Sequence, residues 1–150
     1  MESIQETVIE QLNHLITMAE DGKAGYETAA KDVEEVELKN LFLNLAQERA
    51  LYTRQLQLQV NMLNGNAENS GGPVGAIHRL WMDVKSTFMS DKETILNACI
   101  TGEEAAIGAY KSVLTNTTLS ESVRQLLTEQ IWGIERAWTD IKLRLPKAVV

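Results

Sequence analysis

The sequence has one cysteine, two prolines and no long hydrophobic segment. The single thiol, Cys99, excludes an intramolecular disulfide and a cysteine-rich zinc site, and its apolar neighbours predict a small buried side chain. Outside Pro73 and Pro146, the chain is free of the residue that most often breaks helices. The start, MESIQETVIEQL, is neither basic nor apolar, so we expect no signal peptide, no membrane span and a location in the reducing cytoplasm.

Positive charge is also scarce, because 14 lysines and arginines face 21 aspartates and glutamates, for a net charge of -7. A nucleic-acid-binding surface needs clustered cations that displace counterions from phosphates, and anionic membranes attract the same kind of surface. We therefore expect neither nucleic acid nor membrane as a partner. The length of 150 residues, with 44% hydrophobic and 23% charged side chains, is typical of one soluble globular domain.

Apolar residues recur at three- and four-residue steps nearly throughout the chain, and this spacing predicts helices rather than strands. We predict a single domain over residues 1–150. Its four long helices are expected over residues 3–33, 35–63, 91–114 and 120–145.

Capping residues support these boundaries. Ser3 with Glu6, and Ser90 with Glu93, match the S-x-x-E capping box and predict the starts of the first and third helices. Ser120 is expected to cap the fourth helix. The second helix is expected to end at Asn64-Gly65, where glycine adopts the left-handed conformation easily.

The connection lengths predict the topology. Short turns make the first two helices antiparallel, and likewise the last two, whereas the segment 65–90 is long and contains a predicted short helix over 74–89. At about 1.5 Å per residue, that helix can travel much of the length of the bundle. The sequence therefore predicts an all-α, ferritin-like four-helix bundle with a long crossover between helices two and three. A simple up-down-up-down bundle is the alternative, because a long loop does not force a crossover.

Polar residues fall on the inward faces of the predicted helices. Glu103 shares the stripe of Cys99 and Tyr110, so it should face the core while Glu104 lies on the flank. By the same spacing, Glu48 and Gln130 should also face inward. Because an unpartnered buried carboxylate is costly, hydrogen-bonding side chains, ordered water or a metal ion must satisfy these groups. The candidate protein partners are Arg49 and three tyrosines, Tyr26, Tyr52 and Tyr110.

The sequence lacks the full ligand set of a di-iron carboxylate bundle, which uses one glutamate from each of two helices and Glu-x-x-His from each of the others. The two histidines, His14 and His78, do not form that motif, and Ala19 at the matching height of the first helix cannot bind metal. We therefore favour a hydrogen-bonded polar layer. Oxygen-only sites do hold divalent metals, so iron or another divalent metal is the alternative occupant. Its candidate ligands are Glu48, Glu103, Gln130, Glu20 and Glu135.

The predicted short helix, GAIHRLWMDVKS, holds the other unusual group of residues. His78 and Arg79 lie beside Trp81, which belongs to an apolar stripe that can cover the bundle. This group could bind an anion or a protein partner, but we favour a structural role in bonding the loop to helix ends. Trp132 is expected on the outer side of its helix, where it can contribute to a dimer surface.

Four stretches resemble the bacterial ferritin-like four-helix-bundle proteins known as a domain of unknown function, and the likeness covers residues 12–144. They are LNHLITMAEDGKAGYETAAKDV, AQERA, LNGNAENSGGPVGAIHRLWMDVK and GEEAAIGAYKSVL. The family pattern marks Asp21, Gly22, Tyr26, Gln47, Arg49, His78, Arg79, Trp81, Glu103, Tyr110 and Gln130. The chain departs from it at Trp138, where members usually have histidine, and this weakens the iron interpretation.

The resemblance implies a ferritin-like bundle, commonly a homo-oligomer, with no established activity and a degraded form of the superfamily's di-iron site. We favour this function: a non-enzymatic bundle of unknown biochemical role, with a homodimer as the expected assembly. The first alternative is a protein that binds iron or handles oxidants through Glu48 and Glu103. The second is an interaction module that docks a partner through the His78-Arg79-Trp81 helix.

Overall fold

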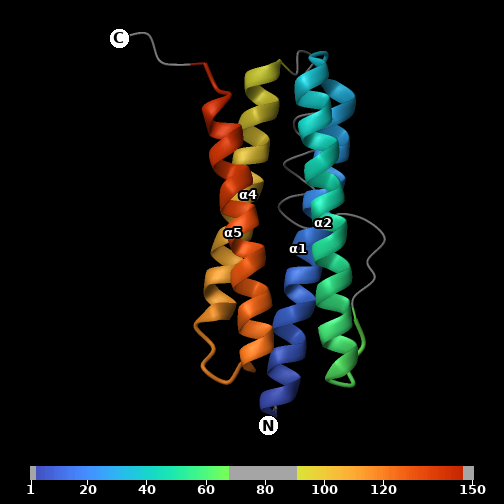
Figure 1. Cartoon of the computed structure of the whole chain (residues 1–150), viewed down its shortest axis with the longest axis vertical. Helices are drawn as coiled ribbons and strands as arrows, with labels where there is room; N and C mark the ends of the chain where they lie inside the picture. The colour runs from blue at the N-terminus through green and yellow to red at the C-terminus, as the bar shows by residue number, and fades with distance from the viewer. Residues whose placement is uncertain (1–2, 68–90, 147–150) are drawn as a thin grey trace.

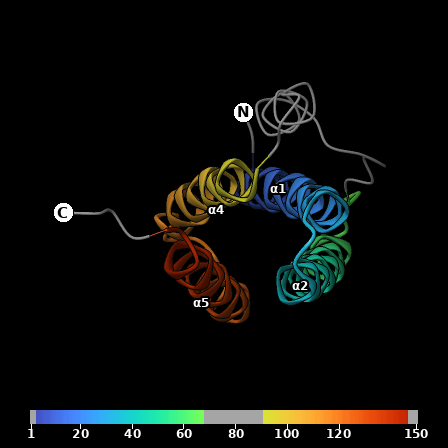
Figure 2. The ribbon, with the colours of Figure 1, turned by 90° about the horizontal axis from the view of Figure 1, so that it is seen from above.

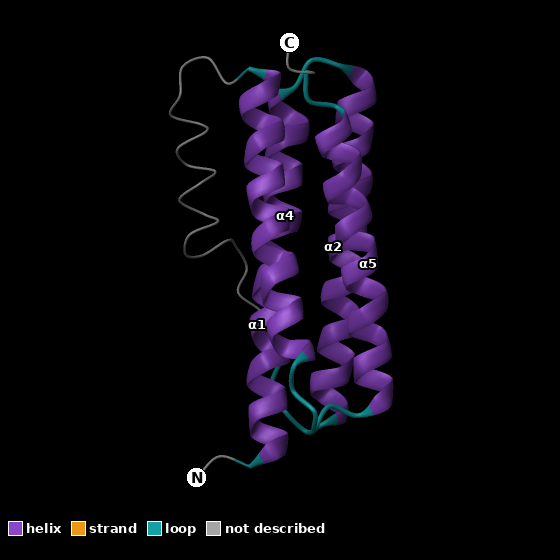
Figure 3. Cartoon of the chain, turned by 90° about the vertical axis from the view of Figure 1, so that its left-hand side faces the viewer, coloured by secondary structure: helices purple, strands orange, loops and turns teal. Residues whose placement is uncertain are grey.

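The computed structural model describes residues 3–67 and 91–146, and in these ranges it contains helices and no strand (Figure 1; Figure 3). The helices are α1 (Ile4–Asp32), α2 (Val36–Met62), α4 (Lys92–Leu114) and α5 (Glu121–Leu143). Each agrees closely with its predicted range. The predicted short helix over 74–89 lies outside the described residues. Among the described helices, none combines the length and the apolar composition that crossing a membrane requires.

Contacts at the two ends of the bundle fix the helix directions. At one end, the ammonium of Lys92, the first residue of α4, lies 3.0 Å from the carboxylate of Glu35 in the α1–α2 turn. At the other end, the Gln5 side chain of α1 donates a hydrogen bond to the carbonyl oxygen of Leu63, just after α2. α2 therefore ends far from where α4 begins, and the two helices run in the same direction (Figure 1). This is the ferritin-like arrangement rather than the up-down-up-down alternative.

The helices are not packed equally. α1 packs against both α2 and α4, and α4 packs against α5, whereas α2 and α5 are neighbours that contact each other only slightly (Figure 2). α2 and α4 lie diagonally across the bundle and do not pack directly. The fold is therefore two antiparallel helical hairpins joined mainly along α1 and α4.

Side-chain caps begin α1, α4 and α5, whereas Glu35 at the start of α2 makes no side-chain cap, and one predicted cap needs correction. Ser3 Oγ accepts from the Glu6 amide at 3.1 Å while the Glu6 carboxylate accepts from the Ser3 amide at 3.2 Å, which is the predicted capping box. Ser120 caps α5 as predicted. The predicted Ser90 cap is wrong: Asp91 caps α4 by accepting from the Thr94 amide at 2.8 Å. An aspartate there serves equally well, and its charge also complements the positive N-terminal end of the helix dipole.

The end of α2 also differs from the prediction. The left-handed residue is Asn64, with φ of 61°, and not Gly65. Asparagine tolerates this conformation better than most residues. Gly65 is needed for another reason, because a Cβ atom there would lie 2.9 Å from side-chain atoms of Ile9 in α1. The glycine thus lets the chain after α2 pass close to α1.

The apolar core forms two clusters with charged residues between them. The cluster near the α1–α2 turn includes Phe42, Leu96 and Ile141, and the other includes Leu12, Leu56 and Leu127. Arg49 and Glu103 fall between the two clusters along α2 and α4 and are both buried. Buried Glu103 and exposed Glu104 confirm the predicted face of α4. The candidate site is therefore a polar layer at mid-height of the bundle.

Candidate functional site: a buried polar layer

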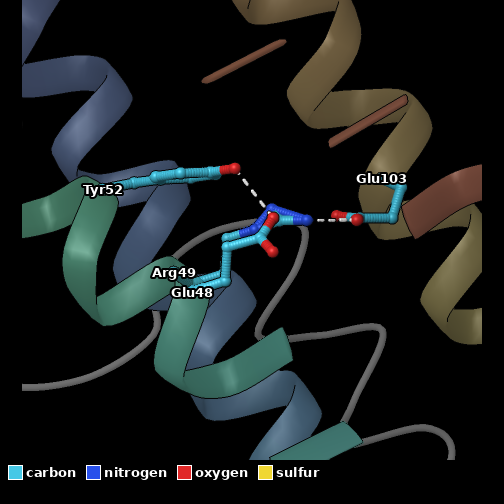
Figure 4. A network of polar contacts seen from close by, with 4 residues as sticks. All are labelled: Glu48, Arg49, Tyr52 and Glu103. Carbon is cyan, nitrogen blue, oxygen red and sulfur yellow. Dashed lines mark hydrogen bonds and ion pairs between the residues drawn. The ribbon is translucent and has the colours of Figure 1, made fainter. Parts of the chain in front are cut away.

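An ion pair crosses the interior of the bundle. The Arg49 guanidinium of α2 contacts the Glu103 carboxylate of α4, and the two residues are only 2% and 3% exposed (Figure 4). Helical periodicity predicts the inward direction of Glu103, and Arg49 was among its predicted partners. Because α2 and α4 lie on a diagonal, the pair links two helices that do not pack against each other.

Aromatic rings surround the guanidinium. Its central carbon lies 5.7 Å from the ring centroid of Tyr26 and 5.6 Å from that of Tyr52, within the range of cation–π attraction. The aliphatic stem of Arg49 packs against Gly22 of α1, where a Cβ atom would lie 3.5 Å from Arg49 Cγ. The positive charge is therefore held by one carboxylate and two aromatic faces.

A second group of hydrogen bonds connects α2, α4 and α5. Tyr52 donates to Glu48 Oε1 at 2.7 Å (Figure 4), and Tyr110 donates to Gln130 Oε1 at 2.6 Å. The Gln130 amide in turn donates to Gln55 Oε1 at 2.9 Å. All three predicted tyrosines and the two glutamates predicted to face inward, Glu48 and Glu103, thus lie in or beside this layer.

Sequence reasoning missed Gly133 of α5, which makes the Tyr52–Glu48 bond sterically allowed. A Cβ atom at this position would lie 1.9 Å from the Tyr52 hydroxyl oxygen and 3.0 Å from Glu48 Oε1. The available signal was a glycine inside an otherwise well-formed helix, which usually has a packing reason. Gln55, the partner of Gln130, was also missed, because an exposed-looking glutamine carries no such signal.

Burial dominates the electrostatics of the layer. It raises the pKa of Glu103 above its ordinary value, and the positive charge of Arg49 lowers that pKa in part. Burial also raises the pKa of Tyr26, Tyr52 and Tyr110, so all three are neutral phenols at physiological pH. Burial lowers the pKa of Arg49, but Glu103, Tyr26, Glu48 and Tyr110 together raise it by more. The pKa of Arg49 therefore lies above its ordinary value, and the guanidinium stays protonated.

A partly open cavity adjoins the ion pair, lined mainly by α1 and α4 and also by Arg49 of α2 and Ile134 of α5, with about 30 Å³ of space for water-sized molecules. Its lining includes Gly22, Tyr26, Arg49, Cys99, Gly102 and Glu103. Cys99 is buried as predicted, and burial raises the pKa of its thiol. The sulfur is therefore in the thiol form, which is a poor nucleophile.

The remaining predicted site residues lie apart from the ion pair. Glu20 is partly exposed and Glu135 is exposed, while Trp138 packs beside the cluster near the α1–α2 turn. In residues 3–67 and 91–146, no three histidine, cysteine, aspartate or glutamate side chains come together as a metal site would require. The predicted interaction segment, His78-Arg79-Trp81, lies outside the described residues and stays a prediction.

Two solved structures have a fold similar to that of this chain. A structure of the dodecameric thioferritin, the bacterioferritin-related protein from Bacteroides fragilis, matches with a TM-score of 0.72 and 16% identity, over 92% of this chain and 83% of that one. A structure of ferritin-like, diiron-carboxylate proteins from Bacillus anthracis matches with a TM-score of 0.63 and 16% identity, over 97% and 94% of the two chains.

These likenesses show the ferritin-like fold. No curated protein matches the sequence. Residues 7–116, well over half of the chain, match the family described as a domain of unknown function, DUF2383, and the protein belongs to that family.

Proposed function

We propose that this protein is a non-enzymatic member of the ferritin-like fold, in which the Arg49–Glu103 ion pair stabilises the interior in place of a di-iron centre. One observation carries the proposal: a guanidinium that is 2% exposed contacts Glu103, the most deeply buried glutamate of the described residues. Arginine cannot lose its proton in a protein, so it is a permanent cation. The charge that a metal would neutralise is already neutralised by the protein.

The donor set also fits iron poorly. A di-iron site of this fold draws four glutamates and two histidines from all four helices. Here Glu48 already accepts a hydrogen bond from Tyr52, and Glu103 is paired with Arg49. The other two candidate carboxylates, Glu20 and Glu135, lie toward the surface. The metal-binding alternative would require these residues to leave their partners, so we assign no chemistry to a metal.

Iron loading tests this proposal directly. Chelator-treated protein, incubated with Fe(II) without oxygen and then desalted, is expected to retain no stoichiometric iron by elemental analysis. Glu103→Gln should behave the same way, and so should Glu104→Gln, its exposed neighbour on α4. Stoichiometric iron in the wild type and in Glu104→Gln, but not in Glu103→Gln, would establish the metal-binding alternative instead.

We also propose that the outer face of α2 is a homo-oligomer interface. Large apolar side chains are exposed there at spacings of seven, eight, seven and four residues, which puts them on one face of the helix. They are Val36, Leu43, Leu51, Leu58 and Met62. Apolar side chains aligned in this way are typical of a protein contact surface. The related thioferritin from Bacteroides fragilis is described as dodecameric, which supports self-association.

Charge placed on this stripe should separate the subunits. We expect Leu51→Lys combined with Leu58→Lys to sediment as a monomer at a concentration where the wild type sediments as a dimer or larger assembly. Ala105→Lys, at an exposed position of α4, is the matched control and should keep the wild-type assembly. A wild type that sediments as a monomer, or a double variant that still assembles, would rule out this interface.

A further inference from the structure

Two buried polar groups beside the ion pair lack a hydrogen-bond partner. They are the Nε–H of Arg49 and the hydroxyl of Tyr26, on side chains that are 2% and 3% exposed. The Tyr26 hydroxyl lies near the Glu103 carboxylate but forms no hydrogen bond of normal geometry with it. Buried polar groups are nearly always satisfied, so each such exception calls for a partner. Both side chains line the same cavity between α1 and α4. Two independent groups therefore point to one occupant of this cavity.

The chemistry of the lining restricts that occupant. Arg49 Nε–H can only donate, and Tyr26 is a neutral phenol, so the occupant must offer lone pairs. A cation would face the guanidinium, and an anion would face the Glu103 carboxylate, which also lines the cavity. The occupant must therefore be neutral, and able both to accept from the two donors and to donate to the carboxylate.

The volume of the cavity restricts it further. A water molecule needs about 10–15 Å³ of such space and two to four polar partners. The cavity measures about 30 Å³ and presents Tyr26, Arg49 and Glu103 as partners. We propose that this cavity is an internal hydration site, in which one or two water molecules accept from Tyr26 and Arg49 and donate to Glu103. This inference does not depend on whether the protein assembles or binds iron elsewhere.

The direct test is nuclear magnetic resonance of arginine labelled with ¹⁵N. Arg49 Nε–H should show cross-relaxation with water. Its sign should be that of a water molecule whose residence time exceeds the rotational correlation time of the protein. Arg54 on the exposed face of α2 serves as the reference, and its Nε–H should show only chemical exchange with bulk water. Absence of the bound-water signal at Arg49 would overturn the proposal.

Two glycines of α4 provide a second, thermodynamic test. A Cβ atom at Gly102 or at Gly108 would meet no atom within 4 Å, but only Gly102 lines the cavity. Gly108→Ala should raise the folding equilibrium constant about fivefold, because alanine is the better helix former. Gly102→Ala gains the same helix propensity but adds a methyl group to the lining of the cavity and so reduces the space for water. It should give less than about a twofold gain in the folding equilibrium constant, or a loss. An equal or larger gain for Gly102→Ala would mean that the cavity is a dry void.

Discussion

Arg49→Met is expected to lower the free energy of unfolding by about 3–5 kcal/mol, because it leaves the buried Glu103 carboxylate without its counter-charge. Methionine keeps much of the length of the side chain, so the loss is mainly that of the charge. Urea denaturation at neutral pH measures the effect. Arg54→Met, on the exposed face of the same helix, should change stability by less than about 0.5 kcal/mol.

Two further measurements separate the charge from the packing. Adding Glu103→Gln to Arg49→Met removes the unpaired charge and should restore a large part of the lost stability. The stability that Arg49→Met loses relative to the wild type should also become smaller as the pH falls. Without Arg49, burial and the charge of Glu48 raise the pKa of Glu103, and only the nearby Tyr26 hydroxyl opposes them. The pKa of Glu103 in the folded state therefore lies well above its value in the unfolded state. The folded variant then takes up a proton more readily than the unfolded chain, and acidification favours folding. A deficit that is unchanged by Glu103→Gln and by pH would assign the effect to packing.

Gly133→Ala should have the second largest effect. Its methyl group would lie 1.9 Å from the Tyr52 hydroxyl oxygen, so Tyr52 must move and its hydrogen bond to Glu48 must break. Overpacking of this kind costs about 1–3 kcal/mol, and we expect a loss of that size relative to Gly108→Ala, which gains helix propensity without a clash.

A double-mutant cycle identifies the cause of that loss. Tyr52→Phe removes the hydroxyl oxygen and leaves the ring carbon Cζ at 3.2 Å as the nearest atom of that side chain. Gly133→Ala should therefore be less costly in the Tyr52→Phe background than in the wild type, as chemical denaturation of all four proteins would measure. Additive effects would show that the methyl group is accommodated by moving α5 instead.

Local sequence signals predict most of the fold because helices depend on local spacing. The three- and four-residue steps of apolar residues give the four long helices, and the Ser3–Glu6 capping box gives the start of α1. The same periodicity places Glu103 in the core, because Glu103 and Tyr110 are one heptad apart. The N-cap of a helix is less predictable where two residues that cap well are adjacent, as at Ser90 and Asp91. Which of them is the cap depends on the position at which the backbone becomes helical.

Partners of the buried groups could not be read from spacing alone. Periodicity points to Glu48 as the inward residue of α2, yet Arg49, one position later, is the more deeply buried. Which of them reaches the interior depends on the rotation of α2 relative to α4, and these helices are far apart in sequence and do not pack directly. The role of Gly133 could not be predicted for the same reason, because it depends on the position of the Tyr52 hydroxyl, which belongs to another helix.

The position of the ion pair has a consequence for how the two hairpins find their alignment. Each hairpin is built from contacts between neighbouring segments, but Arg49 and Glu103 are 54 positions apart and meet only when the hairpins dock. Apolar contacts alone would allow one hairpin to shift along the other, because a leucine displaced from one apolar neighbour would contact the next apolar side chain along the helix. A shift by one helical turn would instead bury a guanidinium and a carboxylate apart, each at a penalty of several kcal/mol. The pair thus selects a single register from the alignments that the apolar clusters alone would permit.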